Sequence, residues 1–361
     1  MRKETFNLWM RLMAGIAASL ILVGAIGLLG GDKMSKGKST EGLFYQVTGL
    51  HPDGELMNVD GESISVEEYL YCLYCRCLQL SAYIPDIDLN EQVTDKMTYG
   101  DYAGKATLEE VKQYALIRKL ARDAGLTLTE GDLAEIDELR NTYIDYFGDE
   151  ETFLAQLSLL GISEDTFLQA TETHCLRQHL KDAYTQPEGA FYPGEAAIAD
   201  YAEVGRYVTA QLLFVDTRKM DEGGKAEALE KMEGYLSNLQ KSEEQDSAFA
   251  AAATELGVDA EATTLCAADT EGEFLEKLQE LAVDELSDVI ATEKGYYIAI
   301  RHELDVDGML EDYFKEQLLE IFAAADVTLN EKLYDAIDPA AFYPALLTLQ
   351  EEMTDQLTKG E

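Results

Sequence analysis

The chain has few basic side chains for its size. It carries 28 Lys and Arg against 70 Asp and Glu over 361 residues, for a formal net charge of -42. A protein that binds nucleic acid neutralises phosphates with a basic face, and such a face would have to form on a strongly anionic body. The composition therefore excludes a nucleic-acid-binding function.

Cysteine and proline are also scarce. Six prolines exclude a proline-rich architecture, and five cysteines are too few for a disulfide scaffold in a chain of this length. Cys72, Cys75 and Cys77 cluster within a helical pattern, whereas Cys175 and Cys266 are distant in sequence, so no four-ligand zinc site is expected. We expect buried thiols on a helix face, with a Cys72–Cys75 redox pair as the alternative.

The common catalytic motifs are absent. The chain has no Walker loop, no Gly-x-Gly-x-x-Gly, no His-Glu-x-x-His and no Gly-x-Ser-x-Gly, so no cofactor is expected. Its four histidines are scattered at His51, His174, His179 and His302. A spacing of five does not align His174 and His179 on one helix face, so we interpret both as ordinary surface or half-buried histidines, and no metal site is predicted.

One long apolar run lies near the N-terminus. Leu12 to Gly31 contains twenty residues without a charge, enough to span the roughly 30 Å hydrocarbon core as a helix. We expect residues 1–31 to be an uncleaved signal anchor with its transmembrane part at 12–31. The alternative is a long cleaved signal peptide, for which Ala25-Ile26-Gly27 loosely fits the cleavage rule.

The charge on either side of this run is uneven. Residues 1–38 carry six Lys and Arg against two acidic residues, a net of +4, so the remaining 323 residues carry -46. Three basic residues precede the run and three follow it, so the positive-inside rule nearly ties. Residues 32–55 are expected to be a flexible tether, because their first part is rich in Gly, Ser, Lys and Thr.

Residues 56–205 are expected to be mostly helical. An extended stretch with an Asp60-Gly61 turn leads to Ser65, the predicted N-cap of a helix that runs to about Tyr83. Further helices are predicted from Thr107 to Gly125, from Thr129 to about Gly148, over 149–160, from Ser163 towards Tyr184, and over 194–202.

At residue 206 the pattern changes. Residues 206–215 and 296–301 are β-rich, and helices are predicted between them over 225–241, from about Ser247, and over 271–281. Two strands with intervening helices indicate a small α/β or α+β domain at 206–303. Residues 310–325 and 328–357 return to helix, and we expect the C-terminal helices of 304–361 to pack on the helical domain. The fold class is therefore α+β.

Several segments resemble one family, the SurA/PrsA-type foldases, which are exported chaperones with parvulin-type peptidyl-prolyl isomerase domains. Residues 59–65, Val-Asp-Gly-Glu-Ser-Ile-Ser, are similar to the opening of the family's helical chaperone domain. Val208 to Phe214 resembles the first parvulin strand, and Ala248 to Ala253 resembles a parvulin helix. Residues 281–290 with Gly295-Tyr296-Tyr297-Ile298 resemble the closing strand and the stretch before it.

The resemblance implies a helical SurA/PrsA-like chaperone domain at 56–205 and a parvulin-like domain inserted at 206–303. The family places two histidines side by side on its central strands, and the equivalent positions here are Gln211 and Tyr297. A glycine-rich segment expected between Ala253 and Phe274 is missing. Gln and Tyr can hydrogen-bond each other but cannot exchange protons near neutral pH as imidazoles do, so the resemblance implies a retained fold with much reduced catalysis.

The sequence therefore predicts a single-pass membrane-anchored, extracytoplasmic chaperone that binds unfolded exported polypeptides, with weak or lost prolyl isomerase activity. Two alternatives stay open at this point. One is an active parvulin-type prolyl isomerase, with Gln211 and Tyr297 as site positions. The other is a structural component of an envelope complex that binds no client.

Overall fold

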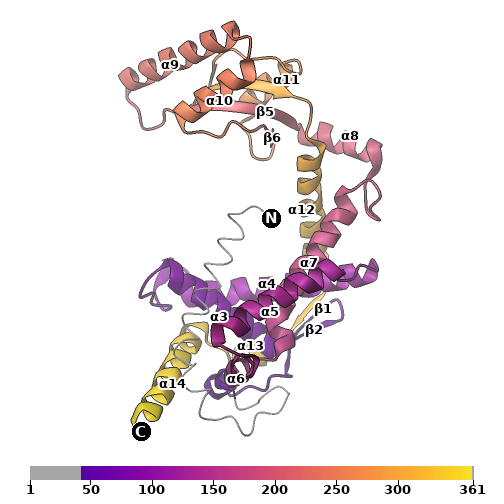
Figure 1. The fold of residues 1–361 in the computed structure, drawn as a ribbon, viewed down its shortest axis with the longest axis vertical. Coiled ribbons are helices and arrows are strands. Elements are labelled where there is room, and N and C mark those ends of the chain that lie inside the picture. The colour runs from indigo at the N-terminus through magenta and orange to yellow at the C-terminus, as the bar shows by residue number, and fades with distance from the viewer. Residues whose placement is uncertain (1–41, 360–361) are drawn as a thin grey trace. The chain divides into compact units, whose positions relative to one another are not determined.

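The computed structural model describes residues 42–359, with side chains through Glu352. The chain forms two compact units (Figure 1). Unit 1 is Met1–Leu180 together with Glu320–Glu361, and unit 2 is Lys181–Leu319. The chain passes between them within two helices, α7 (Glu164–Thr185) and α12 (Val306–Ala324). The α+β fold class is confirmed.

Unit 1 begins with a short buried helix, α2 (Leu43–Thr48). Leu43, Phe44 and Tyr45 are at most 4% exposed, because they pack into the main apolar core of this unit. The expectation of a tether over residues 32–55 is therefore wrong for this part. Three consecutive buried apolar residues stabilise an ordered helix where the polar residues before them suggested a flexible segment.

A small antiparallel sheet follows, with strand order β2-β1-β9. β1 (Glu55–Val59) and β2 (Glu62–Ser65) form a hairpin whose two-residue turn is Asp60-Gly61, both at positive φ. This is the two-residue connection that such a dipeptide favours. Ser65 then caps α3 (Val66–Tyr83) by accepting from the N–H of Glu68 at 3.1 Å, so the predicted helix start is confirmed.

The next helix begins earlier than expected. α4 (Tyr99–Asp123) is capped by Thr98 and Asp101 in a reciprocal capping box, and it follows a short hairpin of β3 (Gln92–Thr94) and β4 (Met97–Thr98). The predicted start at Thr107 is wrong because that residue is buried inside the helix. Gly100 and Gly104 lie on the face where the start of a later helix packs, and a Cβ at either position would overlap Ala340 or Pro339.

Three predicted helices agree with the structure. α5 (Glu130–Phe147) is capped by Thr129, α6 (Glu150–Leu160) ends at Gly161, and α7 begins after Ser163. The N–H and Oγ of Ser163 both donate to the buried carboxylate of Glu67 on α3, at 2.7 and 2.6 Å. These bonds fix the start of α7 against α3.

The C-terminal segment completes unit 1. β9 (Val327–Leu329) pairs antiparallel with β1, and α13 (Glu331–Tyr334) and α14 (Pro339–Lys359) follow. The single helix predicted over 328–357 is wrong at its start, because this three-residue strand pairs with a distant part of the sequence. Phe342 and Leu346 of α14 are buried in the main core with α2 and α3.

Unit 2 is built around a four-stranded antiparallel sheet of order β6-β5-β8-β7. Its elements in chain order are α8 (Gly194–Gly205), β5 (Val208–Asp216), α9 (Glu222–Lys241), α10 (Gln245–Leu256), β6 (Thr263–Leu265), α11 (Gly272–Glu280), β7 (Ile290–Ala291) and β8 (Gly295–His302). The unit extends beyond the expected 206–303 segment at both ends, since α8 and most of α12 belong to it.

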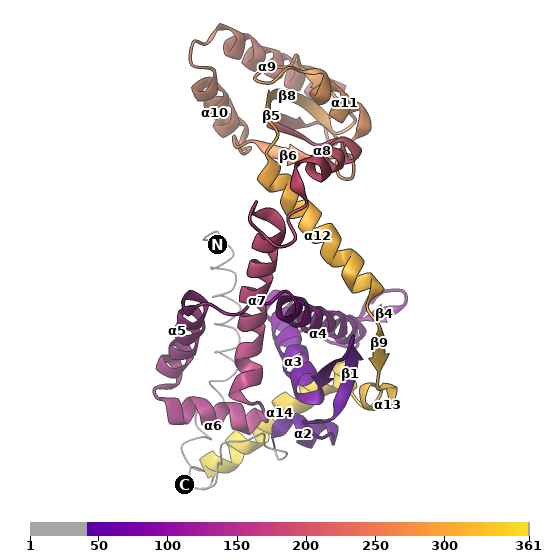
Figure 2. The ribbon, with the colours of Figure 1, turned by 90° about the vertical axis from the view of Figure 1, so that its right-hand side faces the viewer.

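Helices cover both faces of this sheet (Figure 2). On one face, α9 and α10 pack over Leu213, Ile298 and Ile300. On the other, α11 packs over Val208 and Ala299 with Phe274, Leu275 and Leu278. Each face therefore has its own apolar core.

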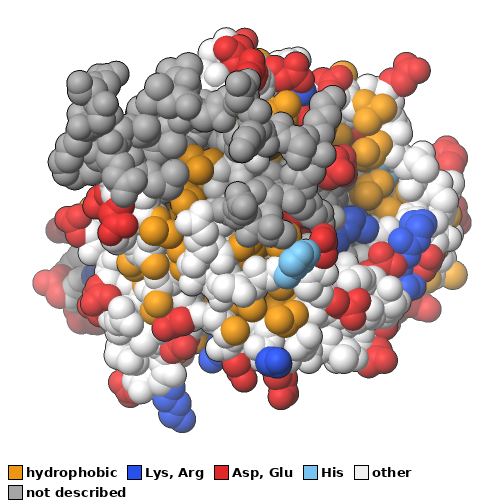
Figure 3. Space-filling model, turned by 90° about the horizontal axis from the view of Figure 1, so that it is seen from below, with side chains coloured by type: hydrophobic (Ala, Val, Ile, Leu, Met, Phe, Trp, Pro, Cys, Tyr) orange, Lys and Arg blue, Asp and Glu red, His pale blue; other side chains and the backbone are white. Residues whose placement is uncertain are grey.

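The predicted transmembrane segment at 12–31 lies outside the described residues. Within residues 42–359, no helix is long and apolar enough to cross a membrane. Acidic side chains are spread over the face shown in Figure 3, and Lys and Arg are fewer there.

Candidate functional site

The two family-equivalent positions lie on the central strands of unit 2. In the β5–β8 ladder, Gln211 is opposite Ile300 and Tyr297 is opposite Phe214. Directly opposed residues share a face of the sheet, and side chains alternate between faces along a strand. Gln211 and Tyr297 therefore project to opposite faces. They cannot form the hydrogen bond expected between them.

Gln211 is held by partners on its own face. Its Nε2 donates to the carbonyl of Ala260 at 2.7 Å, and its Oε1 lies 3.0 Å from His302 Nε2. An amide oxygen only accepts, so His302 Nε2 carries the proton and donates. The other ring nitrogen of His302 lies 3.5 Å from a carboxylate oxygen of the exposed Asp284. Gln211 thus links β5 to the segment before β6 and to the end of β8.

Tyr297 lies between two phenylalanine rings on the α11 face. Its ring stacks on Phe214 with a centroid distance of 4.4 Å and an interplanar angle of 20°, and it lies 4.4 Å from the ring of Phe274. Burial, reinforced by the charge of Glu271, raises the pKa of the Tyr297 phenol. At neutral pH this phenol is a neutral donor and acceptor rather than an acid–base catalyst.

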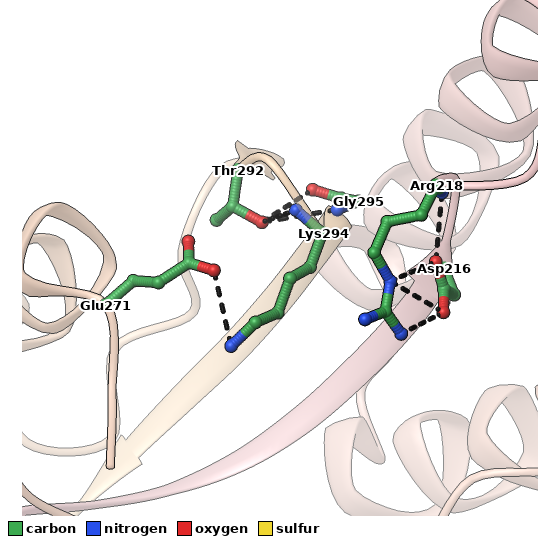
Figure 4. A network of polar contacts seen from close by, with 6 residues as sticks. All are labelled: Asp216, Arg218, Glu271, Thr292, Lys294 and Gly295. Carbon is green, nitrogen blue, oxygen red and sulfur yellow. Dashed lines mark hydrogen bonds and ion pairs between the residues drawn. The ribbon is translucent and has the colours of Figure 1, made fainter. Parts of the chain in front are cut away.

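Figure 4 shows a network of charged and polar groups in unit 2, of which Glu271, Arg218 and Asp216 act electrostatically on Tyr297. Arg218 and Asp216 form a multiple ion pair, with Nη2 to Oδ2 at 2.5 Å, and the hydrogen bond from Arg218 lowers the pKa of Asp216 to about 2. Lys294 Nζ lies 3.3 Å from Glu271. Thr292 Oγ1 accepts from the N–H groups of Lys294 and Gly295, which closes the turn into β8.

The aromatic stack and this network form the candidate site, in which the half-buried rings of Phe214 and Tyr297 lie against the buried ring of Phe274 and are bordered by two ion pairs. It could hold an apolar or prolyl group by ring contact. Of the two predicted positions, only Tyr297 contributes to it.

The sequence carries weak signals for the other members of this region. Phe214 ends the segment that resembles the first parvulin strand, and Phe274 lies in a predicted helix, but neither belongs to a motif that marks a site. His302 is one of four scattered histidines. Only the strand register brings it to Gln211.

The remaining candidate residues have structural roles. Burial raises the pKa of Cys75 and Cys77 to about 12, so both stay protonated thiols at neutral pH. His179 Nε2 lies 2.7 Å from Asp132, and His174 is exposed. Across residues 42–359, no group of His, Cys, Asp and Glu side chains could hold a metal ion.

Among comparisons with protein families, curated proteins and solved structures, only the solved structures give matches. No protein-family profile and no curated protein matches the chain. Among solved structures, it is similar to a SurA-like chaperone of Campylobacter jejuni, with 12% identity, coverage of 76% of this chain and 98% of that one, and a TM-score of 0.22. It is also similar to PrsA of Bacillus subtilis, with 19% identity, coverage of 75% of this chain and 93% of that one, and a TM-score of 0.25. A third match is the foldase protein PrsA of Streptococcus pneumoniae, with 20% identity, coverage of 73% of this chain and 92% of that one, and a TM-score of 0.25. At these identities and TM-scores the likeness establishes no shared activity.

Proposed function

We propose that this protein is a membrane-anchored extracytoplasmic chaperone that binds unfolded exported polypeptides and has little or no prolyl isomerase activity. In this proposal, residues 1–31 anchor the chain, unit 1 forms the chaperone domain, and unit 2, with its sheet and covering helices in 206–303, forms a degenerate parvulin-like domain. The location outside the cytoplasm rests on the sequence resemblance and on the apolar run at 12–31.

One observation carries the proposal. Unit 1 is made from both ends of the described chain, and unit 2, with its antiparallel sheet, is inserted between them. The sequence resemblance implies the same order, a helical domain around a smaller α+β domain. Two units with separate apolar cores give one chain two independent bodies, an arrangement that suits a protein that holds long unfolded segments.

The loss of isomerase activity is supported by the site. Rotation about an X–Pro bond faces a barrier of about 18–20 kcal/mol, and positioned acid–base groups are typically worth about 10² to 10⁴ in rate. Here Gln211 is engaged by Ala260 and His302, and Tyr297 is on the other face between two rings. Neither can take the place of a paired imidazole.

The active isomerase remains the second candidate, because a specific observation favours it. The half-buried rings of Phe214 and Tyr297, which lie against the buried Phe274, are aromatic groups against which a prolyl ring can pack. A protease-coupled assay on an X–Pro peptide separates the two candidates. A rate close to background supports the chaperone, and a rate well above background would replace it with the enzyme.

Suppression of aggregation tests the proposed function. The full chain, kept in detergent because of its apolar N-terminal run, is mixed at equimolar ratio with a chemically unfolded model protein, and light scattering is followed after dilution. We expect scattering to fall relative to the same detergent with an equally acidic folded protein that is not a chaperone. Scattering equal to this control would contradict the proposal and favour the scaffold alternative.

A further inference from the structure

In the unit 2 sheet, the later part of β5 has a partner strand on one side only. In the β5–β8 ladder, Thr217 N–H donates to the carbonyl of Lys294 at 3.0 Å, continuing the register in which Val215 faces Tyr296 and Leu213 faces Ile298. The odd-numbered residues of β5 therefore direct their backbone groups to β8, and the even-numbered ones direct theirs to the other side.

On that other side, β6 covers only the start of β5. The pairing joins residues 208–210 to 263–265 and goes no further. Among the residues that the structure describes, the backbone N–H and C=O groups of Leu212 and Phe214 have no hydrogen-bond partner. We call this side of residues 211–216 the open edge. Its backbone groups need water or another strand, since backbone polar groups that are buried and unpaired destabilise the fold.

The neighbouring strand β8 has backbone hydrogen bonds on both sides, so the unpaired stretch is confined to the open edge of β5. One side of β8 is hydrogen-bonded to β5 along its whole length. On its other side, β8 pairs with β7 at Tyr296 and Tyr297, and the backbone groups of Ala299 and Arg301 bond to the segment before β7. An unbroken regular edge that carries apolar side chains is a template for another extended chain. The half-buried Leu212 and Phe214 give the open edge this character.

Charge disfavours a second copy of this chain as the occupant. Between Lys181 and Leu319 there are 32 acidic and 11 basic side chains, a net of -21. At one end of the open edge, the exposed Asp259 and Glu261 flank Ala260, whose carbonyl binds Gln211. At the other end, Asp216 is paired with Arg218. Two such units repel each other, whereas a strand with Lys or Arg side chains is attracted.

We infer that the open edge binds an extended segment of a foreign polypeptide as an added antiparallel or parallel strand, with apolar side chains next to Phe214 and Leu212 and basic side chains near Asp259 and Glu261. This inference deepens the proposed chaperone function and rests on it for the identity of the partner as an unfolded chain. Backbone hydrogen bonds would supply affinity with little dependence on sequence, which is what a binder of many unfolded chains needs.

A labelled peptide of alternating valine and lysine, about ten residues long, is the probe. It is titrated against the full chain in detergent and followed by fluorescence anisotropy. The matched control is the same peptide with an N-methyl group on every residue, which keeps its side chains but leaves no N–H on either edge to form a ladder. We expect the control to bind at least about tenfold more weakly, because it loses two or more backbone bonds. Equal binding, or no binding by either peptide, overturns the inference.

Two protein variants locate the binding. Phe214→Pro removes the N–H that points to the open edge and no bond to β8, and a strand edge tolerates such a proline. Phe214→Val keeps that N–H and loses the same ring. We expect Phe214→Pro to bind the unmodified peptide about five- to tenfold more weakly than Phe214→Val. If the two bind equally, the edge is not the site.

Amide exchange at single-residue resolution keeps the test valid if Phe214→Pro fails to fold. In the wild-type chain, the peptide should slow exchange at Leu212 and Phe214, while Leu213 and Val215 are already slow. Slow exchange at all four without peptide, together with a dimer in sedimentation, would show a second copy on the edge and overturn the inference. If Phe214→Pro and Phe214→Val bind the peptide equally and both still suppress aggregation, the edge inference fails while the proposed function stands.

Discussion

Single residues at helix ends account for some of the order in unit 1. Thr129 accepts from the N–H of Asp132, and Asp132 Oδ2 accepts from Thr129 N–H at 2.6 Å. We expect Thr129→Ala to lower the free energy of unfolding of the helical unit by about 1 kcal/mol, because the first turn of α5 loses its cap. Hydrogen exchange of α5 across a urea series measures this. Thr127→Ala, in the loop just before, should have almost no effect.

The same cap gives unit 1 a pH dependence. Hydrogen bonds from Thr129, together with His179, lower the pKa of Asp132 to about 2, below its ordinary value of about 3.9. The group therefore stabilises the fold above about pH 4, and this contribution is lost as pH falls towards 2. The stability of Asp132→Asn should change less than that of the wild type in this window, and equal slopes would contradict the assignment.

Gly161 lies so close to the ring of Tyr45 that only a residue without a side chain fits there. It caps α6 at φ +92°, and an added Cβ would lie 2.4 Å from the ring of Tyr45, whose hydroxyl donates to the Gly161 carbonyl at 2.7 Å. Gly125 has a similar φ of +70° with open space around it. We expect Gly125→Ala to destabilise unit 1 by about 1 kcal/mol and Gly161→Ala by about 1–3 kcal/mol more. Equal urea midpoints would refute the contact with α2.

At the scale of elements, the strand register decides what the predicted site can do. Gln211→His with Tyr297→His restores the two family residues, yet the imidazoles would project to opposite faces of the sheet. We expect no gain in the X–Pro isomerisation rate over the wild type. Phe214→His with Tyr297→His is the comparison, because these positions face each other across the ladder, with Cβ atoms about 4.5–5.5 Å apart.

Only the second of these variants should show contacts between its two imidazoles by NMR. A clear rate gain in Gln211→His with Tyr297→His would mean that the β5–β8 register in solution differs from the one described.

Local signals predict the elements better than they predict the pairings. Ser65, Thr129 and Ser163 each cap a helix where the sequence places a start. Thr107-x-x-Glu110 has the same pattern, but it lies within α4, because the helix already begins at the capping box formed by Thr98 and Asp101. β9 is not predicted because three residues carry no periodicity of their own. The opposed faces of Gln211 and Tyr297 follow from a register that spacing along either strand does not determine.

At the scale of the whole molecule, the two units should differ in their dependence on the C-terminus. Truncation after Asp326 removes β9, α13 and α14, and with them the buried side chains of Ile337, Phe342 and Leu346. We expect amides of α3 and α4 to lose protection from exchange, while those of β5 and β8 keep it and serve as the internal control. Loss of protection in both units together would show that they unfold as one.

The pairing of β9 with β1 also sets an order of events during synthesis. The hairpin of β1 and β2 is complete at Ser65, but its third strand ends at Leu329, about 260 residues later. At 5–20 residues per second, the ribosome takes roughly 15 to 50 s to supply it. Unit 2 is finished within that interval and can fold while unit 1 still has one strand missing. A newly made chain therefore carries its folded insert before the surrounding helical unit is closed.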